Sequence, residues 1–105
     1  MKKEPQAVNL AGLVTVQPGA VVSKTIIDKK VGTVTIFAFD QGQGLSEHTA
    51  PYNALIQVLE GEVEITVSGK PYPVKQGEFI ILPANEPHAL NGITAFKMLL
   101  TMIRA

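Results

Sequence analysis

Turn signals recur at short intervals along this chain, and they constrain its fold more than any other feature. Glycine and proline punctuate it repeatedly, for example at Pro18-Gly19, Glu60-Gly61 and Asn91-Gly92. Glycine adopts the positive φ that tight hairpin turns need, and Asn-Gly is a strong hairpin signal. Val, Ile and Thr make up 28 of the 105 residues, and these β-branched residues pack better on pleated strands than in helices. The chain is therefore predicted to be all-β, as a sandwich or barrel.

The runs between the turns have the length of strands. We expect strands at 14–16, 20–27, 31–39, 54–59, 62–68, 71–75, 78–82, 87–90 and 93–103. From Glu62 to Val67 the odd positions are apolar and the even ones polar, which is typical of a half-buried antiparallel strand. Phe39 is expected in the core. No window of eleven residues combines an apolar stripe at helical spacing with a cap and a stop.

Length and composition limit the function classes. A chain of 105 residues has room for one core, so we expect one domain over 1–105, with 1–12 as a mobile arm or a swapped edge strand. The formal net charge is zero, which argues against a nucleic-acid partner. The absence of cysteine excludes disulfides and thiolate metal sites. No segment is apolar enough for a membrane span or a signal peptide, so no membrane partner and a cytoplasmic location are expected.

Two histidines are the only imidazoles in the chain, and both lie beside turn signals. His48 follows a glycine-rich stretch that begins at Gly42, and His88 follows the proline-punctuated turn 83–87. A closed β-barrel can bring two such positions together in its interior. Because imidazole titrates near neutral pH and binds metals, these two residues are the best candidates for an acid–base, ligand-binding or metal-binding role.

At this point the sequence resembles the small single-domain cupins, of the RmlC-like jelly-roll type. The resemblance covers 46–90 well, with a first motif over 42–61 and a second over 77–92. Six residues fall at the spacing of the family's two motifs: Gly42, His48, Gly61, Gly77, Pro83 and His88. The resemblance implies a double-stranded β-helix, or jelly-roll barrel, whose lumen holds the site.

The chain departs from the family's motifs at the metal ligands. The resemblance implies three histidines and a glutamate around a divalent ion, but Ala50 and Ala54 stand at two of the four positions. Asn85 replaces a motif glycine, and Gly92 stands where the family has asparagine. One reading is a divalent metal (Zn, Fe, Mn or Ni) held weakly by His48 and His88. The other is a pair of neutral, hydrogen-bonded imidazoles in a largely apolar cavity.

Met98 and Tyr52 are further candidates for ligand contact. Met98 and Met102 share a face of the last strand with Leu100, while Lys97 marks the outer side. These methionines fit either an adaptable pocket wall or ordinary core packing. Tyr52 follows His48 closely and is placed either over the mouth of the barrel or on the surface.

Three functions remain open from the sequence. The first is a module that binds a small, mostly apolar or acidic molecule in a barrel lumen enlarged and dried by the two alanines. The second is a metal-dependent enzyme of the dioxygenase, isomerase or decarboxylase type, which rests on fold-level analogy. The third is a dimer scaffold without a ligand, as a homodimer that exchanges edge strands. A homodimer is the expected assembly of this chain.

Overall fold

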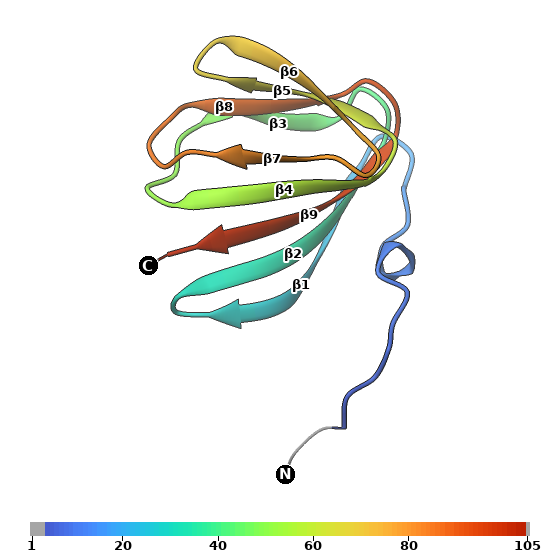
Figure 1. Ribbon diagram of the computed structural model, residues 1–105. Helices are drawn as coiled ribbons and strands as arrows, with labels where there is room; N and C mark the ends of the chain where they lie inside the picture. Colours follow the sequence, from blue (N-terminus) through green and yellow to red (C-terminus); the bar gives the residue numbers. More distant parts are fainter. Residues whose placement is uncertain (1–3, 105) are drawn as a thin grey trace.

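Nine antiparallel strands form two facing sheets in the computed structural model, which describes residues 4–104 (Figure 1). They are β1 (Val21–Lys29), β2 (Gly32–Phe39), β3 (Gly44–His48), β4 (Asn53–Glu60), β5 (Glu62–Val67), β6 (Lys70–Lys75), β7 (Phe79–Leu82), β8 (His88–Gly92) and β9 (Phe96–Ile103). A single 3-10 turn, η1 (Ala11–Leu13), precedes them. No helix within 4–104 is long and apolar enough to cross a membrane.

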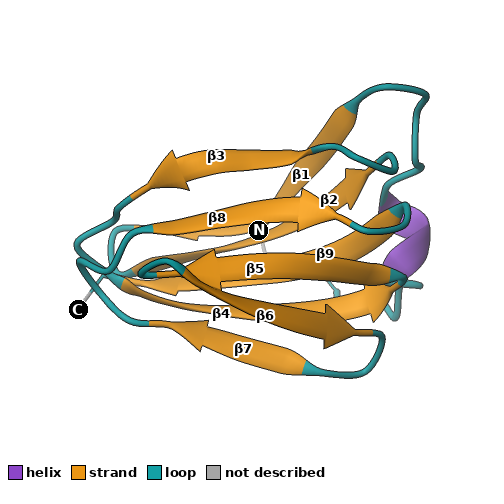
Figure 2. Cartoon of the chain, turned by 90° about the horizontal axis from the view of Figure 1, so that it is seen from above, coloured by secondary structure: helices purple, strands orange, loops and turns teal. Residues whose placement is uncertain are grey.

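The strand order confirms the predicted jelly roll. One sheet has the order β1-β2-β9-β4-β7 and the other β3-β8-β5-β6. Figure 2 looks down on the four-stranded sheet and shows its strands in that order. Strands distant in sequence are neighbours in both sheets, as β2 and β9 are in one and β3 and β8 in the other. The chain therefore alternates between the sheets and encloses a lumen between them.

Two strand predictions are wrong. Residues 14–16 form no strand, because Val14 packs on the outer face of the five-stranded sheet instead of pairing with it. Residues 44–48, for which no strand was expected, form β3 along β8. Gly44 permits this approach, since a Cβ there would lie 1.9 Å from the Leu90 carbonyl oxygen.

The expected arm is only partly described. Residues 4–10 form no strand within this chain, and 1–3 lie outside the described residues.

The main core lies between the sheets. Its buried members are Phe39, Ala54, Ile56, Val58, Val63, Ile65, Val74, Leu82, Leu90, Phe96 and Met98. The alternation predicted for β5 is confirmed, since Val63 and Ile65 are buried. Phe39 and Phe96 stack in parallel with ring centroids 4.4 Å apart, and they fill the end of the lumen near the start of β9.

A second, smaller cluster lies on the outer face of the five-stranded sheet. Val14 covers Ile36 and Ala38 there, and neighbouring apolar side chains of the N-terminal segment pack around them. The Lys97 ammonium faces outward, as expected, and donates a hydrogen bond to the Ala11 carbonyl at 2.7 Å. The N-terminal segment therefore closes one half of this face.

Candidate functional site

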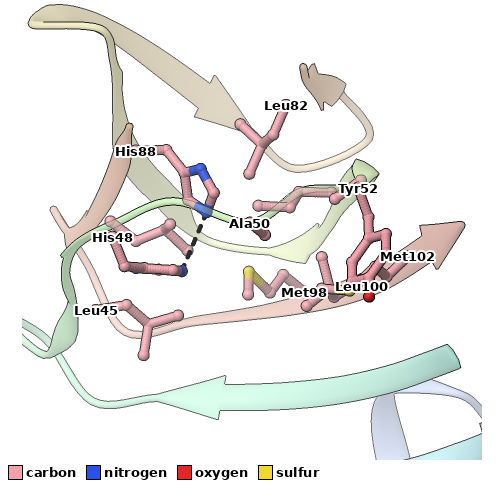
Figure 3. A pocket seen from close by; sticks show the side chains of 12 residues that line it. Leu45, His48, Ala50, Tyr52, Leu82, His88, Met98, Leu100 and Met102 are labelled. Carbon is pink, nitrogen blue, oxygen red and sulfur yellow. Dashed lines mark hydrogen bonds between the residues drawn. The ribbon is translucent and has the colours of Figure 1, made fainter. Parts of the chain in front are cut away.

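A cavity of about 100 Å³ remains in the lumen at the end away from the stacked phenylalanines. Figure 3 shows its walls, to which five strands and the connection after β3 contribute side chains. Apart from the imidazoles of His48 and His88 and the phenol of Tyr52, every side chain that lines it is apolar. The cavity is therefore a largely apolar pocket whose polar groups are two imidazoles on one wall and the phenol of one tyrosine.

A β-bulge brings the two histidines to the same pocket. Leu45 pairs with Leu90 and His48 with His88, so three steps along β3 match two steps along β8. In a regular strand, residues three apart point to opposite faces. The extra residue of the bulge turns His48 back to the side of Leu45, where it meets His88.

The two imidazoles face each other through their Nε2 atoms. These atoms are 3.1 Å apart, and the rings meet edge to face at 70° (Figure 3). Each Nδ1 lies against a backbone carbonyl, that of Ser46 at 2.7 Å for His48 and that of Glu86 at 3.2 Å for His88. A carbonyl oxygen only accepts, so we assign the proton of each ring to Nδ1.

This tautomer assignment leaves two lone pairs pointing at each other across 3.1 Å. Two neutral rings would repel in that arrangement, and two fully protonated rings would oppose two N–H groups. The geometry fits one positive centre shared between the Nε2 atoms, either a proton or a cation. Burial in apolar surroundings lowers the pKa of His88, the Glu86 carbonyl opposes that shift, and the neighbouring His48 adds to it.

The turn before β8 holds His88 in place. Asn85 adopts a left-handed backbone with φ of 67°, and its N–H donates to the Ala50 carbonyl at 2.8 Å. The Ala84 N–H donates to the Asn53 side chain at 2.9 Å. Asparagine tolerates this conformation better than other residues with a side chain. The replacement of the motif glycine by Asn85 therefore preserves the turn.

The two alanine replacements change the chemistry of the site. Ala50 and Ala54 both line the cavity beside the histidine pair. Among residues 4–104 no group of three or more His, Cys, Asp or Glu side chains is placed to hold a metal. A tightly bound zinc needs at least three protein ligands. The donor set therefore does not fit the four-ligand metal centre that the resemblance implies.

The other predicted site residues also line the cavity. Met98 is fully buried on its wall, with Leu100 and Met102 further along β9. The Tyr52 ring lies across the pocket from the imidazoles in Figure 3. The Arg104 guanidinium, which no sequence pattern indicated, lies 6.0 Å from the centre of that ring.

Leu45 is one of four pocket residues that the sequence did not indicate, together with Ile56, Leu82 and Leu90. It faces His48 only because β3 is a strand with a bulge, and its neighbours Ser46 and Glu47 give no apolar alternation. No local pattern predicts the bulge. Only the pairing of β3 with β8 would have placed Leu45 in the lumen, and the structure is what reveals this pairing.

The comparisons with known proteins place this chain among the cupins. It is 31% identical to a conserved protein of unknown function from Streptococcus pyogenes, with a TM-score of 0.93, covering 99% of this chain and 91% of that one. It is 45% identical to a cupin 2 conserved barrel domain protein from Leptotrichia buccalis, with a TM-score of 0.89. That match covers 91% of this chain but 47% of the other, so this chain spans about half of that relative's length.

A more distant likeness shows the fold alone. A salicylate 1,2-dioxygenase from Pseudaminobacter salicylatoxidans superposes with a TM-score of 0.74 at 15% identity, covering 83% of this chain and 27% of that one. A search of curated protein sequences gave no match. The family model described as "Cupin domain" matches residues 35–103, which is more than half of the chain. This chain belongs to the cupin domain family.

Proposed function

We propose that this cupin is a binding protein for a small, largely apolar acid, which it holds in the lumen against the His48–His88 pair. The observation that carries the proposal is the pairing of the two Nε2 atoms at 3.1 Å on the wall of an apolar pocket. Specificity in such pockets comes from a few polar groups placed among apolar walls. Here those groups are the two imidazoles.

The size of the pocket limits the ligand. A cavity of about 100 Å³ is somewhat smaller than an engineered 150 Å³ cavity that accepts benzene. Benzene has six non-hydrogen atoms, so this cavity suits a ligand, or a ligand head, of at most about six. Ala50 and Ala54 provide this space, because larger side chains at these positions would project into the cavity.

The charge of the site favours an acid. A bound carboxylate would stabilise a proton held between His48 and His88, and among residues 4–104 no carboxylate side chain lines the pocket to take its place. The Arg104 guanidinium, 6.0 Å from the centre of the Tyr52 ring, carries a further positive charge beside that ring. A ligand carboxylate would accept a charge-assisted hydrogen bond from the imidazole pair, and its alkyl part would contact Met98.

Isobutyrate and isobutyramide are a matched pair of probes, since they have the same shape and differ in charge. Calorimetry should show isobutyrate binding at least about tenfold more tightly than the amide. His48→Gln or His88→Gln should remove that preference, whereas Glu64→Gln, on the exposed side of β5, should retain it. Equal affinity for acid and amide, or a preference that survives both histidine changes, would contradict the proposal.

A metal-dependent enzyme is the second candidate. The observation in its favour is the convergence of both Nε2 atoms on one point, which also suits a cation with open positions. Elemental analysis of untagged protein tests it, together with the His48→Ala/His88→Ala variant. Near-stoichiometric metal that the variant loses would favour the enzyme. A trace level equal in both proteins would favour the binding protein.

A further inference from the structure

The end of β9 brings two polar side chains to the mouth of the lumen. Met102 lines the lumen pocket, whereas the next residue, Ile103, lines a groove on the outer face. Side chains alternate between the two faces of a sheet, so Arg104 returns to the lumen side. On the neighbouring strand Asn53 pairs with Ile103, which places Tyr52 beside Arg104. The guanidinium accordingly lies 6.0 Å from the centre of the Tyr52 ring.

The turn between β1 and β2 fixes Arg104 at this place. The Arg104 N–H donates to the Val31 carbonyl at 2.7 Å, which extends the pairing of β9 with β2 beyond the end of β9. One guanidinium nitrogen lies 3.4 Å from the Lys29 carbonyl oxygen. A guanidinium carries several N–H donors in a planar fork, so most of them remain available to a ligand.

The charge around Arg104 is positive. Among residues 4–104 the one ion pair joins Lys97 to Glu60, at the packed end of the lumen, so no described carboxylate pairs with the Arg104 guanidinium. The β1–β2 hairpin, residues 21–39, carries three lysines, and Asp28 is its only acidic residue. A positive charge without a carboxylate partner, next to a basic hairpin, attracts anions to this mouth.

Tyr52 adds a neutral hydrogen-bonding group to the same place. Its ring is part of the pocket wall and lies across the cavity from His48 and His88 (Figure 3). Tyr52 is only partly buried, so this wall borders the solvent. A phenol hydroxyl donates one hydrogen bond and can bind an oxygen atom of a ligand. The pocket therefore has polar groups at two opposite ends and apolar walls between them.

We propose that the ligand carries a second carboxylate, which the Arg104 guanidinium and the Tyr52 hydroxyl bind at the mouth of the lumen. This inference rests on the proposed function, because the first carboxylate is the one that meets the imidazole pair. Hydrogen bonds between a guanidinium and a carboxylate are charge-assisted and stronger than those between neutral groups. The ligand class then narrows to short dicarboxylic acids with an apolar middle.

The size of the cavity sets the length of this ligand. A cavity of about 100 Å³ holds at most about six non-hydrogen atoms, which is one carboxylate followed by about three carbons. A second carboxylate attached to the last of these carbons then lies outside the cavity, at its mouth. Glutarate has this composition and is therefore the probe for the second site.

Glutarate and its half-amide, glutaramate, are a matched pair, since they have the same shape and differ in the charge of one end. Calorimetry should show glutarate binding at least about tenfold more tightly than glutaramate. Arg104→Gln should remove this preference, whereas Arg104→Lys should retain part of it because the charge is kept. Tyr52→Phe should weaken both ligands, since the phenol donates to either end group. Lys75→Gln, which removes an equal charge from an exposed position of β6, is the control and should leave the preference unchanged.

Butyrate separates a failure of this inference from a failure of the proposed function. It has the inner carboxylate and the three following carbons of glutarate, and it lacks the outer carboxylate. If butyrate binds and glutarate binds no better than glutaramate, the second site is wrong and the proposed function stands. If neither butyrate nor glutarate binds, both are wrong. A preference for glutarate that survives Arg104→Gln would overturn the assignment of the second carboxylate to Arg104.

Discussion

The two ends of the lumen share strand β9, yet one is packed and the other is open. At the packed end, Phe39 and Phe96 stack with centroids 4.4 Å apart and both are buried. At the open end, Ala54 on the inner face of β4 and Met102 on the inner face of β9 line the pocket. The backbone pairing of β4 and β9 continues through both ends. The difference lies in side-chain size, so the pocket is a property of a few residues and not of the barrel.

The comparison also separates stability from function. Residues at the packed end fill the core and so contribute to stability, whereas Ala50 and Ala54 leave a cavity that is not required for stability. The histidine pair is positioned by backbone carbonyls and by the bulge in β3. Changes at the two ends are therefore expected to have opposite consequences for stability and binding.

The largest effect is expected at the packed end. Phe96→Ala removes one ring of the buried stack and should lower the free energy of unfolding by about 3–5 kcal/mol. Urea denaturation measures it. The control is Ile103→Ala on the same strand, which is 51% exposed and should cost less than about 1 kcal/mol. If the two variants lost similar free energies of unfolding, the stacked rings would not be the main contribution of the packed end to stability.

Two substitutions at the open end should create a metal-binding site. Ala50→His with Ala54→Glu restores the ligand set that the family resemblance implies, so the variant should bind Co²⁺ or Zn²⁺ about a hundredfold or more tighter than the natural chain. Competition with a chelator dye measures the affinities. Ala50→Gln with Ala54→Gln adds bulk without a metal ligand of that kind, and it should bind no better than the natural chain. An unchanged metal affinity in the Ala50→His/Ala54→Glu variant would mean that side chains at these two positions do not point toward the His48–His88 pair.

Filling the open end should remove binding with little change in stability. Ala54→Leu puts an isobutyl group into the 100 Å³ cavity, so isobutyrate binding should fall by more than about tenfold, while stability changes by less than about 1.5 kcal/mol. Calorimetry and urea denaturation measure the two quantities. A loss of stability comparable to that of Phe96→Ala would indicate that the open end is as tightly packed as the other.

The smallest effect concerns pH. Burial lowers the pKa of His88, so its contribution to stability is present above the unfolded-state pKa near 6.5. As the pH falls below that value, the unfolded chain takes up a proton that the folded chain resists, and stability decreases by up to about 1.4 kcal/mol per pH unit. Urea denaturation at several pH values measures this slope. His88→Gln should flatten it, and a slope unchanged by that substitution would assign the effect to other groups.

Much of the fold could be predicted from the sequence, because turns and alternation are local signals. The Glu60-Gly61 turn and the buried positions Val63 and Ile65 needed no knowledge of distant residues. β3 could not be predicted, since its strand state depends on Gly44 lying against Leu90, forty-six residues away. The packing of Val14 on the outer face was hidden for the same reason.

The candidate site follows the same division. Motif spacing singled out His48 and His88, and strand periodicity placed Met98 toward the lumen. The facing Nε2 atoms could not be predicted, because they depend on a bulge and on two backbone carbonyls. Arg104 carried no pattern at all, and only the tertiary structure brings it to Tyr52.

Nuclear magnetic resonance of the ring nitrogens tests the central claim most directly, because the chain has only two histidines and three methionines. We expect both Nδ1 atoms to carry a proton and both Nε2 signals to shift when isobutyrate is added. The methyl signals of Met98 and Met102, which line the pocket, should shift with them. Nε2-protonated neutral rings, or isobutyrate shifts that spare both histidines and both of these methionines, would contradict the account.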